Sequence, residues 1–310
     1  MQGNGIHHIT AIAGSAQRNV TFYAGTLGLR LVKKTVNFDD PGTYHFYFGD
    51  AVGTPGTLIT FFPWSGMAAG RLGIGEVAEV LFRVPEESFG YWTHRFIENG
   101  VPHENPETVF GEKRLPFRDP EGMRLALVGI KRAGIENAWT GGTISGDHAI
   151  RGLHGASLLV DAADPTAAIL TGVLGFAETG RDGPRRRLET GAVQPGAIIE
   201  VREAGGFLPA RMGAGSIHHI AFRAADDATQ AQLADTLRRE HRMLTTEQKD
   251  RQYFRSVYFR EPGGVLFEIA TDGPGFAIDE APDRLGEELK LPPFLEAHRR
   301  DIEARLPEVA

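Results

Sequence analysis

Four stretches of the chain share a short, mostly apolar run that is followed by a segment with helical character. The runs are GIHHITAIA (5–13), EVAEVLFRV (76–84), GLHGASLLV (152–160) and SIHHIAFRA (216–224). Short apolar runs bounded by turn residues are typical of buried β-strands, so we interpret them as opening strands. The segments that follow, predicted as helices, lie at about 15–24, 86–99, 164–172 and 226–240.

Each unit also ends in the same way, with a turn that contains proline and glycine and then an apolar strand. These closing segments are PGTLITFF (55–62), PEGMRLALV (120–128), PGAIIEV (195–201) and PGGVLFEIA (262–270). Because the turn marks where the strand begins, the units can be aligned on it. The pattern predicts an α+β protein built from four βαβββ modules.

The alignment defines two recurring positions, which we call slots. The slot of the opening strand holds His8, Glu79, Gly155 and His219, and the slot of the closing strand holds Thr60, Ala126, Glu200 and Glu268. The two slots of a unit are separated by 45 to 52 residues in all four units. This near-constant spacing indicates a structural repeat.

Two units per domain predict an N-terminal domain at 1–135 and a C-terminal domain at 150–275. The stretch between them, 132–149, is rich in Gly, Thr and Ser, as is typical of a linker. The remainder, 276–310, is predicted to be a helical tail that clasps the rest of the chain.

The composition of the chain limits which partners and which metal ligands it can have. A length of 310 residues with 41% hydrophobic residues allows a core in each of two domains. A net charge of -7 makes nucleic acid an improbable partner. Since the chain has no cysteine, any transition metal must be held by His, Asp, Glu or water. Neither a signal peptide nor a membrane span is recognisable, so we expect a cytoplasmic protein that does not bind membranes and that can form homo-oligomers.

Histidines occur as adjacent pairs in two of the opening strands, His7-His8 and His218-His219. One histidine on a strand is usually a core residue, but two pairs at equivalent positions favour a site. Since neighbours on a strand point to opposite faces, we expect one histidine of each pair to face a cavity.

A carboxylate in the apolar run VLFEIA is costly to bury unless it is paired or binds a metal, which makes Glu268 the third candidate. Only a pairing of the first and last units unites His8, His219 and Glu268 around one cavity, with Thr60 in the fourth slot. We therefore predict that these two units meet, and we interpret Glu200 as a structural or vestigial residue. Two imidazoles and one carboxylate are the ligand set of non-haem Fe(II) oxygenases, and Mn(II) or another divalent metal suits the same ligands.

The IHHIT and IHHIAF motifs and the segment YFRSVYFREPGGVLFEIATD (253–272) resemble the vicinal oxygen chelate superfamily, which includes glyoxalases, bleomycin resistance proteins and dioxygenases. Within it, the chain resembles hydroquinone-type ring-cleaving dioxygenases from about residue 5 to about 295. The resemblance implies two domains of incomplete mixed β-barrels with flanking helices. It also implies iron held by His8, His219 and Glu268.

The same resemblance suggests roles for further residues. Arg251 and Tyr258 match positions beside the substrate, and His218 is a candidate acid–base group, although strand alternation argues against its reaching the cavity. Thr10 and His7 are expected to bind substrate. The implied reaction is Fe(II)-dependent, extradiol-type cleavage of an aromatic diol by O₂. The alternatives are a glyoxalase-like isomerase or lyase, for which Thr60 replaces a needed carboxylate, and a non-catalytic binding protein of the same fold.

Overall fold

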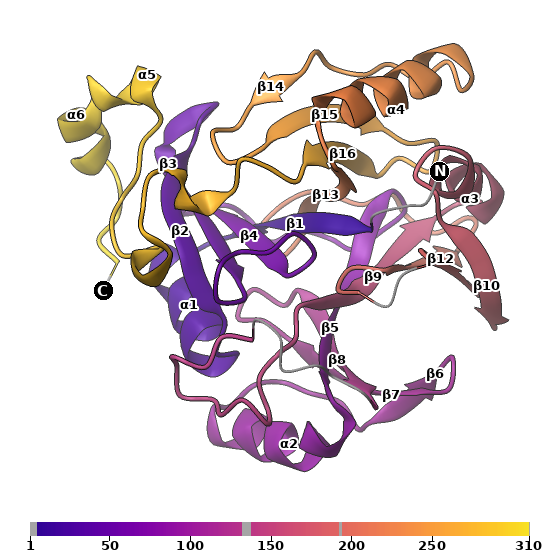
Figure 1. Cartoon of the computed structure of the whole chain (residues 1–310). Helices are drawn as coiled ribbons and strands as arrows, with labels where there is room; N and C mark the ends of the chain where they lie inside the picture. Colours follow the sequence, from indigo (N-terminus) through magenta and orange to yellow (C-terminus); the bar gives the residue numbers. More distant parts are fainter. Residues whose placement is uncertain (1–4, 132–137, 192–193, 310) are drawn as a thin grey trace.

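The structure, a computed structural model of the chain, describes residues 5–131, 138–191 and 194–309, and it contains the four predicted modules (Figure 1). The first module consists of β1 (Ile6–Ala13), α1 (Ala16–Val20), η1 (Thr21–Thr26), β2 (Arg30–Asn37), β3 (Asp40–Gly49) and β4 (Leu58–Pro63). The second consists of β5 (Glu76–Pro85), η2 (Glu86–Ser88), α2 (Phe89–Glu98), β6 (Glu107–Val109), β7 (Glu112–Arg118) and β8 (Arg124–Ile130).

The second half of the chain repeats this order. The third module consists of β9 (Leu153–Val160), α3 (Ala163–Gly172), β10 (Ala177–Asp182), β11 (Arg185–Glu189) and β12 (Ile198–Glu203). The fourth consists of β13 (Ile217–Ala224), α4 (Asp227–Arg239), β14 (Lys249–Asp250), β15 (Arg255–Arg260) and β16 (Leu266–Thr271). The predicted opening strands, helices and closing strands are thus confirmed.

Within the described residues, sixteen strands form two eight-stranded sheets, and each sheet combines modules from both halves of the chain. One sheet has the order β14-β15-β16-β13-β1-β4-β3-β2, and the other has the order β10-β11-β12-β9-β5-β8-β7-β6. Antiparallel pairing of β1 with β13 joins the first module to the last, and β5 pairs with β9 in the same way. The predicted contact between the first and last units is confirmed, as is the α+β fold with two curled, incomplete barrels.

Strand register supports the slot alignment in every module. The residue two positions after each opening slot pairs with the closing slot of the same module, as Thr10↔Thr60, Leu81↔Ala126, Ser157↔Glu200 and Ala221↔Glu268. Because side chains on a strand alternate, the two slots of each module project to the same side of the sheet.

Local side chains explain where the elements begin. In the turn before β8, Asp119 Oδ1 accepts hydrogen bonds from the backbone N–H groups of Glu121 and Met123, and Glu261 holds the turn before β16 in the same way. At the start of α4, Asp226 caps the helix by accepting a hydrogen bond from Thr229 N at 2.8 Å. Arg238 and Arg239 in the last turn complement the helix dipole.

A continuous apolar core unites the two sheets. It contains buried residues of the first sheet, such as Phe46 and Phe222, together with residues of the second, such as Phe82 and Leu158. The helices lie on the outer faces (Figure 1), where α3 contacts β12 and α4 contacts β16. The inner, concave side of each sheet therefore remains available for a site.

The C-terminal segment, yellow in Figure 1, runs along the outer edge strand β2 and contains the short helices η3 (Phe276–Ile278), η4 (Pro282–Arg284), α5 (Pro293–Glu296) and α6 (Arg299–Glu303). The fully buried ammonium of Lys33 on β2 forms ion pairs with Asp279 and Glu280 of this segment. Leu291 and Ile302 pack with Val36 of the same strand. The tail thus covers the sheet edge, which otherwise presents unpaired backbone groups.

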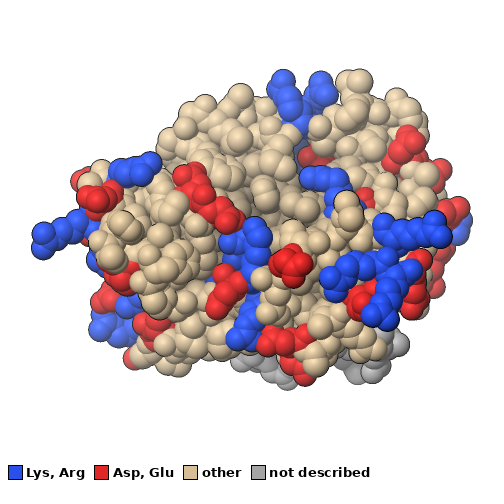
Figure 2. Space-filling model, turned by 90° about the horizontal axis from the view of Figure 1, so that it is seen from above, with Lys and Arg blue, Asp and Glu red and all other residues tan. Residues whose placement is uncertain are grey.

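Residues 132–137 of the predicted linker lie outside the described residues. The proposed domain limits, 1–135 and 150–275, stay a prediction, since each sheet draws on both halves. Among the described residues, no helix is long and apolar enough to cross a membrane. On the face shown in Figure 2, acidic and basic side chains are interspersed rather than gathered by sign.

Candidate metal centre

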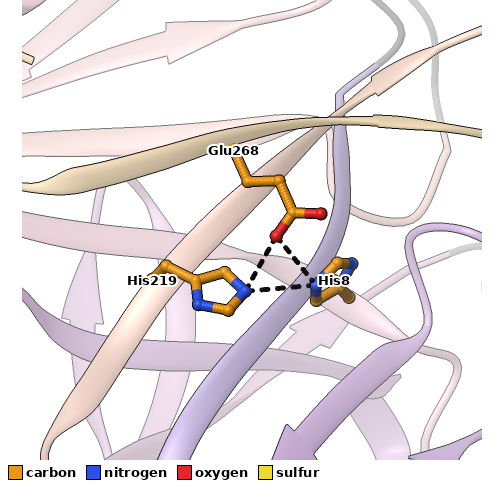
Figure 3. Close-up of side chains that lie close together, drawn as sticks. All are labelled: His8, His219 and Glu268. Carbon is orange, nitrogen blue, oxygen red and sulfur yellow. Dashed lines mark hydrogen bonds and ion pairs between the residues drawn. The ribbon is translucent and has the colours of Figure 1, made fainter. Parts of the chain in front are cut away.

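His8, His219 and Glu268 converge from three adjacent strands, β1, β13 and β16 (Figure 3). One potential ligand atom of each lies within 4.8 Å of the others, and all three residues are buried. The Nε2 atoms of the two histidines are 3.4 Å apart, and Glu268 Oε2 lies 2.9 Å from His219 Nε2 and 3.5 Å from His8 Nε2. The structure therefore brings together all three residues predicted as metal ligands.

Two β-bulges shape this site. Between β1 and β13 the register shifts at His7 and again at His218, so each strand carries one extra residue beside its metal-ligand candidate. A bulge suspends the strict alternation of side chains, and His218 lines the same cavity as His219. Our expectation that strand alternation keeps His218 out of the cavity was wrong for this reason.

The extra histidines orient the ligand candidates. His7 Nδ1 lies 2.9 Å from His8 Nδ1, and His218 Nδ1 lies 2.7 Å from His219 Nδ1. Burial, followed by the neighbouring histidine, lowers the pKa of His218 to about 3 and that of His7 well below its usual value. Both are therefore neutral near pH 7, and the Nδ1 of each can accept a hydrogen bond from the Nδ1–H of the ligand candidate. That tautomer directs the Nε2 lone pairs of His8 and His219 to the site.

Glu268 provides the test of whether a cation fits. Its Oε1 accepts a hydrogen bond from Ser256 Oγ at 2.5 Å, whereas its buried Oε2 receives no aligned hydrogen bond from the described residues. Burial opposes ionisation, but His8 and His219 hold the pKa of the carboxylate well below its usual range. A charged, buried oxygen beside two imidazole lone pairs is the arrangement that a divalent cation stabilises.

A cavity of about 320 Å³ opens onto His8 and His219. Aromatic side chains make up much of its wall, contributed by Phe38, His45, Tyr47, Phe62, Trp64, Phe254 and Tyr258. A cavity of this size and character suits a small aromatic molecule lying against the metal-ligand candidates.

Arg251 and Tyr258, predicted to lie beside the substrate, both line this cavity. Arg251 forms an ion pair of 2.8 Å with Asp39, and its Nε donates to Tyr258 Oη at 3.4 Å. Burial and then the charge of Glu268 raise the pKa of Tyr258, so this residue remains a neutral phenol that can donate a hydrogen bond.

Thr10 and His7, which we expected to bind substrate, are not among the cavity-lining residues. Thr10 is fully buried and its hydroxyl lies 2.8 Å from that of Thr60. His7 packs on Phe254 and contacts His8 from behind. A direct contact of either side chain with a substrate in this cavity is therefore not supported, and both belong to the layer beneath its wall.

Sequence reasoning missed Ser256, His45 and Tyr47. Ser256 lies two positions before Tyr258 on β15, and strand alternation could have placed it on the face of Glu268. His45 and Tyr47 lie on β3. In the sequence YHFYF (44–48), these two polar rings alternate with two phenylalanines, and this pattern could have indicated that both side chains point to the same face.

The second sheet presents the same slots without a metal-ligand set. Glu200 corresponds to Glu268, but it accepts hydrogen bonds from Arg114, at 2.5 and 3.1 Å, and from Arg187, at 3.0 Å. Arg187 pairs with Glu200 across the ladder as Tyr258 pairs with Glu268. The structural interpretation of Glu200 is consistent with this buried ion-pair cluster.

A family model described as the Glyoxalase/Bleomycin resistance protein/Dioxygenase superfamily matches residues 5–127. Full-length relatives extend the match to the rest of the chain, and the chain belongs to this superfamily. Among these relatives is MhqO of Bacillus subtilis (strain 168), assigned as a ring-cleaving dioxygenase, with 46% identity over 97% of this chain and 95% of that protein. The chlorohydroquinone/hydroquinone 1,2-dioxygenase of Sphingobium indicum is 33% identical over 96% of this chain and 94% of that protein.

Solved structures agree on the fold. A crystal structure assigned as a dioxygenase from Bacillus subtilis has a TM-score of 0.95 at 44% identity, covering 100% of this chain and 98% of the other. Glyoxalase I from Zea mays has a TM-score of 0.63 at 15% identity, covering 86% of this chain and 92% of the other, and this shows a shared fold alone.

Proposed function

We propose that the protein is an Fe(II)-dependent, extradiol-type ring-cleaving dioxygenase that acts on a hydroquinone or a related dihydroxybenzene. The observation that carries the proposal is a buried set of two histidines and one carboxylate at the base of an aromatic cavity. Such a set occupies one face of an octahedral metal and leaves positions for a substrate oxygen and for O₂. The relatives named as ring-cleaving and hydroquinone dioxygenases support the same reaction class.

When bound, Fe(II) would supply electron transfer between the aromatic ring and O₂, and His8, His219 and Glu268 would hold it. The protein's other groups act on the substrate. Arg251 offsets negative charge on a phenolate oxygen, and Tyr258 donates a hydrogen bond to it. His218, neutral and at the cavity wall, accepts from His219 through Nδ1, so its Nε2–H is placed to donate a hydrogen bond to a substrate oxygen.

Thr60 distinguishes this proposal from a glyoxalase-like isomerase. That chemistry requires a further carboxylate at the metal, and the fourth slot here holds a threonine whose hydroxyl is engaged by Thr10 and His45. Thr60 therefore has neither the charge nor the freedom to serve as a base.

The direct test is to load the protein with Fe(II) without oxygen and then to measure O₂ uptake with a panel of hydroquinones and catechols. We expect uptake with at least one hydroquinone and the appearance of a ring-opened product. Absence of uptake with every dihydroxybenzene would reject the proposal, and turnover of a glutathione hemithioacetal would favour the isomerase.

Glu268→Ala supplies the matched negative control. We expect this variant to lose both metal retention and O₂ uptake, because the two imidazoles alone leave the cation without its charged ligand. Metal analysis after desalting measures the first effect independently of activity. Unchanged metal content in Glu268→Ala would show that the metal binds elsewhere.

A further inference from the structure

Four side chains form a hydrogen-bonded chain along one wall of the first sheet. Thr10 Oγ1 lies 2.8 Å from Thr60 Oγ1, His45 Nε2 lies 2.9 Å from Thr60 Oγ1, and His45 Nδ1 lies 2.9 Å from Tyr47 Oη. The chain crosses from β1 through β4 to β3, which are neighbours in the sheet. Neither His45 nor Tyr47 has a part in the function proposed above.

The chain ends at the cavity. His45 and Tyr47 line the cavity, whereas Thr10 and Thr60 are fully buried beneath it. Both ring nitrogens of His45 are occupied by hydroxyl partners, so His45 has no nitrogen left for a ligand. Tyr47 Oη has His45 as its hydrogen-bond partner among the described residues, and a phenolic hydroxyl supports more than one hydrogen bond.

Packing fixes the position of Tyr47. Its ring contacts those of Phe276 at 5.1 Å and Tyr253 at 6.2 Å, and it stacks obliquely on His45 at 4.1 Å. The residue is only 2% exposed. Burial, and then the nearby Tyr258 and Glu268, raise the pKa of Tyr47 well above its usual value, so its hydroxyl remains protonated.

Tyr47 and the metal-ligand candidates approach the cavity from different parts of the sheet. His8, His219 and Glu268 come from β1, β13 and β16, whereas β3 lies two strands beyond β1 on the other side. At about 4.8 Å per strand, the backbones of β1 and β3 lie roughly 10 Å apart along the sheet, so Tyr47 and the metal-ligand candidates occupy different parts of the cavity wall. Tyr258 on β15, and Arg251 just before that strand, reach the same cavity from the side of the sheet beyond β16.

We propose that Tyr47, oriented by His45, hydrogen-bonds the second ring hydroxyl of a hydroquinone whose first oxygen lies at the metal centre. This inference rests on the proposed function and identifies the group that selects the para arrangement. A catechol places both oxygens on the same side of its ring, at the metal, and leaves no hydroxyl for Tyr47. Tyr47 is thus a substrate-positioning residue, and His45 acts through it.

Calorimetric binding to the Fe(II)-loaded protein without O₂ tests the inference, with hydroquinone and phenol as probes. In wild type, we expect hydroquinone to bind more tightly than phenol. Tyr47→Phe should weaken hydroquinone binding by about tenfold, the effect of one hydrogen bond, and leave phenol binding unchanged. Tyr44→Phe, the same substitution on the same strand at a residue that does not line the cavity, should change neither.

His45→Phe keeps a ring in place but removes both nitrogens. We expect His45→Phe to weaken hydroquinone binding as much as Tyr47→Phe does. We expect the double variant, with both substitutions, to bind hydroquinone no more weakly than Tyr47→Phe alone. In steady-state kinetics, kcat/KM for hydroquinone relative to catechol should fall by about the same factor in both variants. Retained iron in each variant verifies that it is folded.

Equal weakening of hydroquinone and phenol in Tyr47→Phe would overturn the inference, because Tyr47 would then only shape the cavity. So would unchanged binding of both. If the iron-loaded wild type binds no dihydroxybenzene at all, the proposed function fails first, and the inference falls with it.

Discussion

Each oxygen of the Glu268 carboxylate has a different neighbour. Oε1 accepts the hydrogen bond from Ser256, and Oε2 faces the two histidines. Ser256 therefore determines which oxygen is presented to a metal and how the carboxylate is rotated. Hydrogen-bond partners of this kind usually alter metal affinity without being ligands.

Ser256→Ala should therefore weaken metal binding by about 10- to 100-fold while the protein stays folded. Equilibrium competition with a chelator of known affinity measures the change. Ser157→Ala is a matched control, since Ser157 is buried at the position that pairs with Glu200 in the second sheet. Equal affinities for wild type and Ser256→Ala would show that Ser256 does not orient the carboxylate.

At the scale of single strands, the bulges at His7 and His218 mark the limit of pattern-based prediction. The ligand candidates were predictable because His8, His219 and Glu268 recur in aligned slots, and register is set by the turns. The bulges were not predictable, because a strand with one extra residue has the same run of mostly apolar residues as a regular strand. For the same reason, the position of His218 at the cavity, and of His7 and Thr10 beneath it, required the structure.

In the second sheet, the residue that corresponds to Glu268 is Glu200, and two arginines stabilise its charge. Glu200→Gln leaves the buried Arg114 and Arg187 without their shared carboxylate, and breaking such a cluster costs about 3–5 kcal/mol. We expect denaturant unfolding to show a loss in that range, with metal content per folded protein unchanged. A loss of metal in Glu200→Gln would mean that metal binding in the first sheet depends on the ion-pair cluster of the second.

Glu112 on β7 also belongs to this cluster, since its Oε2 accepts a hydrogen bond from Arg187 at 2.5 Å and lies 3.1 Å from His154 Nε2. Its carboxylate makes the stability of the cluster depend on pH. Burial opposes its ionisation, but His154 and Arg187 lower the pKa of Glu112 from 4.5 to about 2. Since folding favours the ionised form, the stabilisation is complete above pH 4.5 and is lost as the pH falls toward 2. The free energies of unfolding of wild type and Glu112→Gln should differ by at most about 3 kcal/mol at pH 7, and by less at pH 3. A difference that stays constant from pH 7 to pH 3 would contradict this assignment.

For the whole molecule, the exchange of modules between halves makes the two halves interdependent. The repeat allowed the first and last units to be paired from sequence, because no other pairing unites two histidines with a carboxylate. The contacts of the C-terminal segment could not be predicted in this way, because the partners of Lys33 lie nearly 250 residues away and carry no periodic signal.

Separate production of residues 1–137 and 138–310 should therefore yield fragments that do not retain metal. The first fragment carries His8 alone, and the second carries His219 and Glu268 without the neighbouring strand β1. Mixing the two during refolding should restore metal retention, measured by metal analysis after gel filtration. Retention by the second fragment alone would show that β1 is dispensable for the site.

The pairing of β1 with β13 also sets the order of events during synthesis. Glu268 leaves the ribosome 260 residues after His8, because 268 minus 8 is 260. An unfinished chain that ends before residue 268 thus lacks the full ligand set. Premature termination before residue 268 then releases a product without the complete set of candidate ligands, so metal binding at this centre is confined to chains that extend past Glu268.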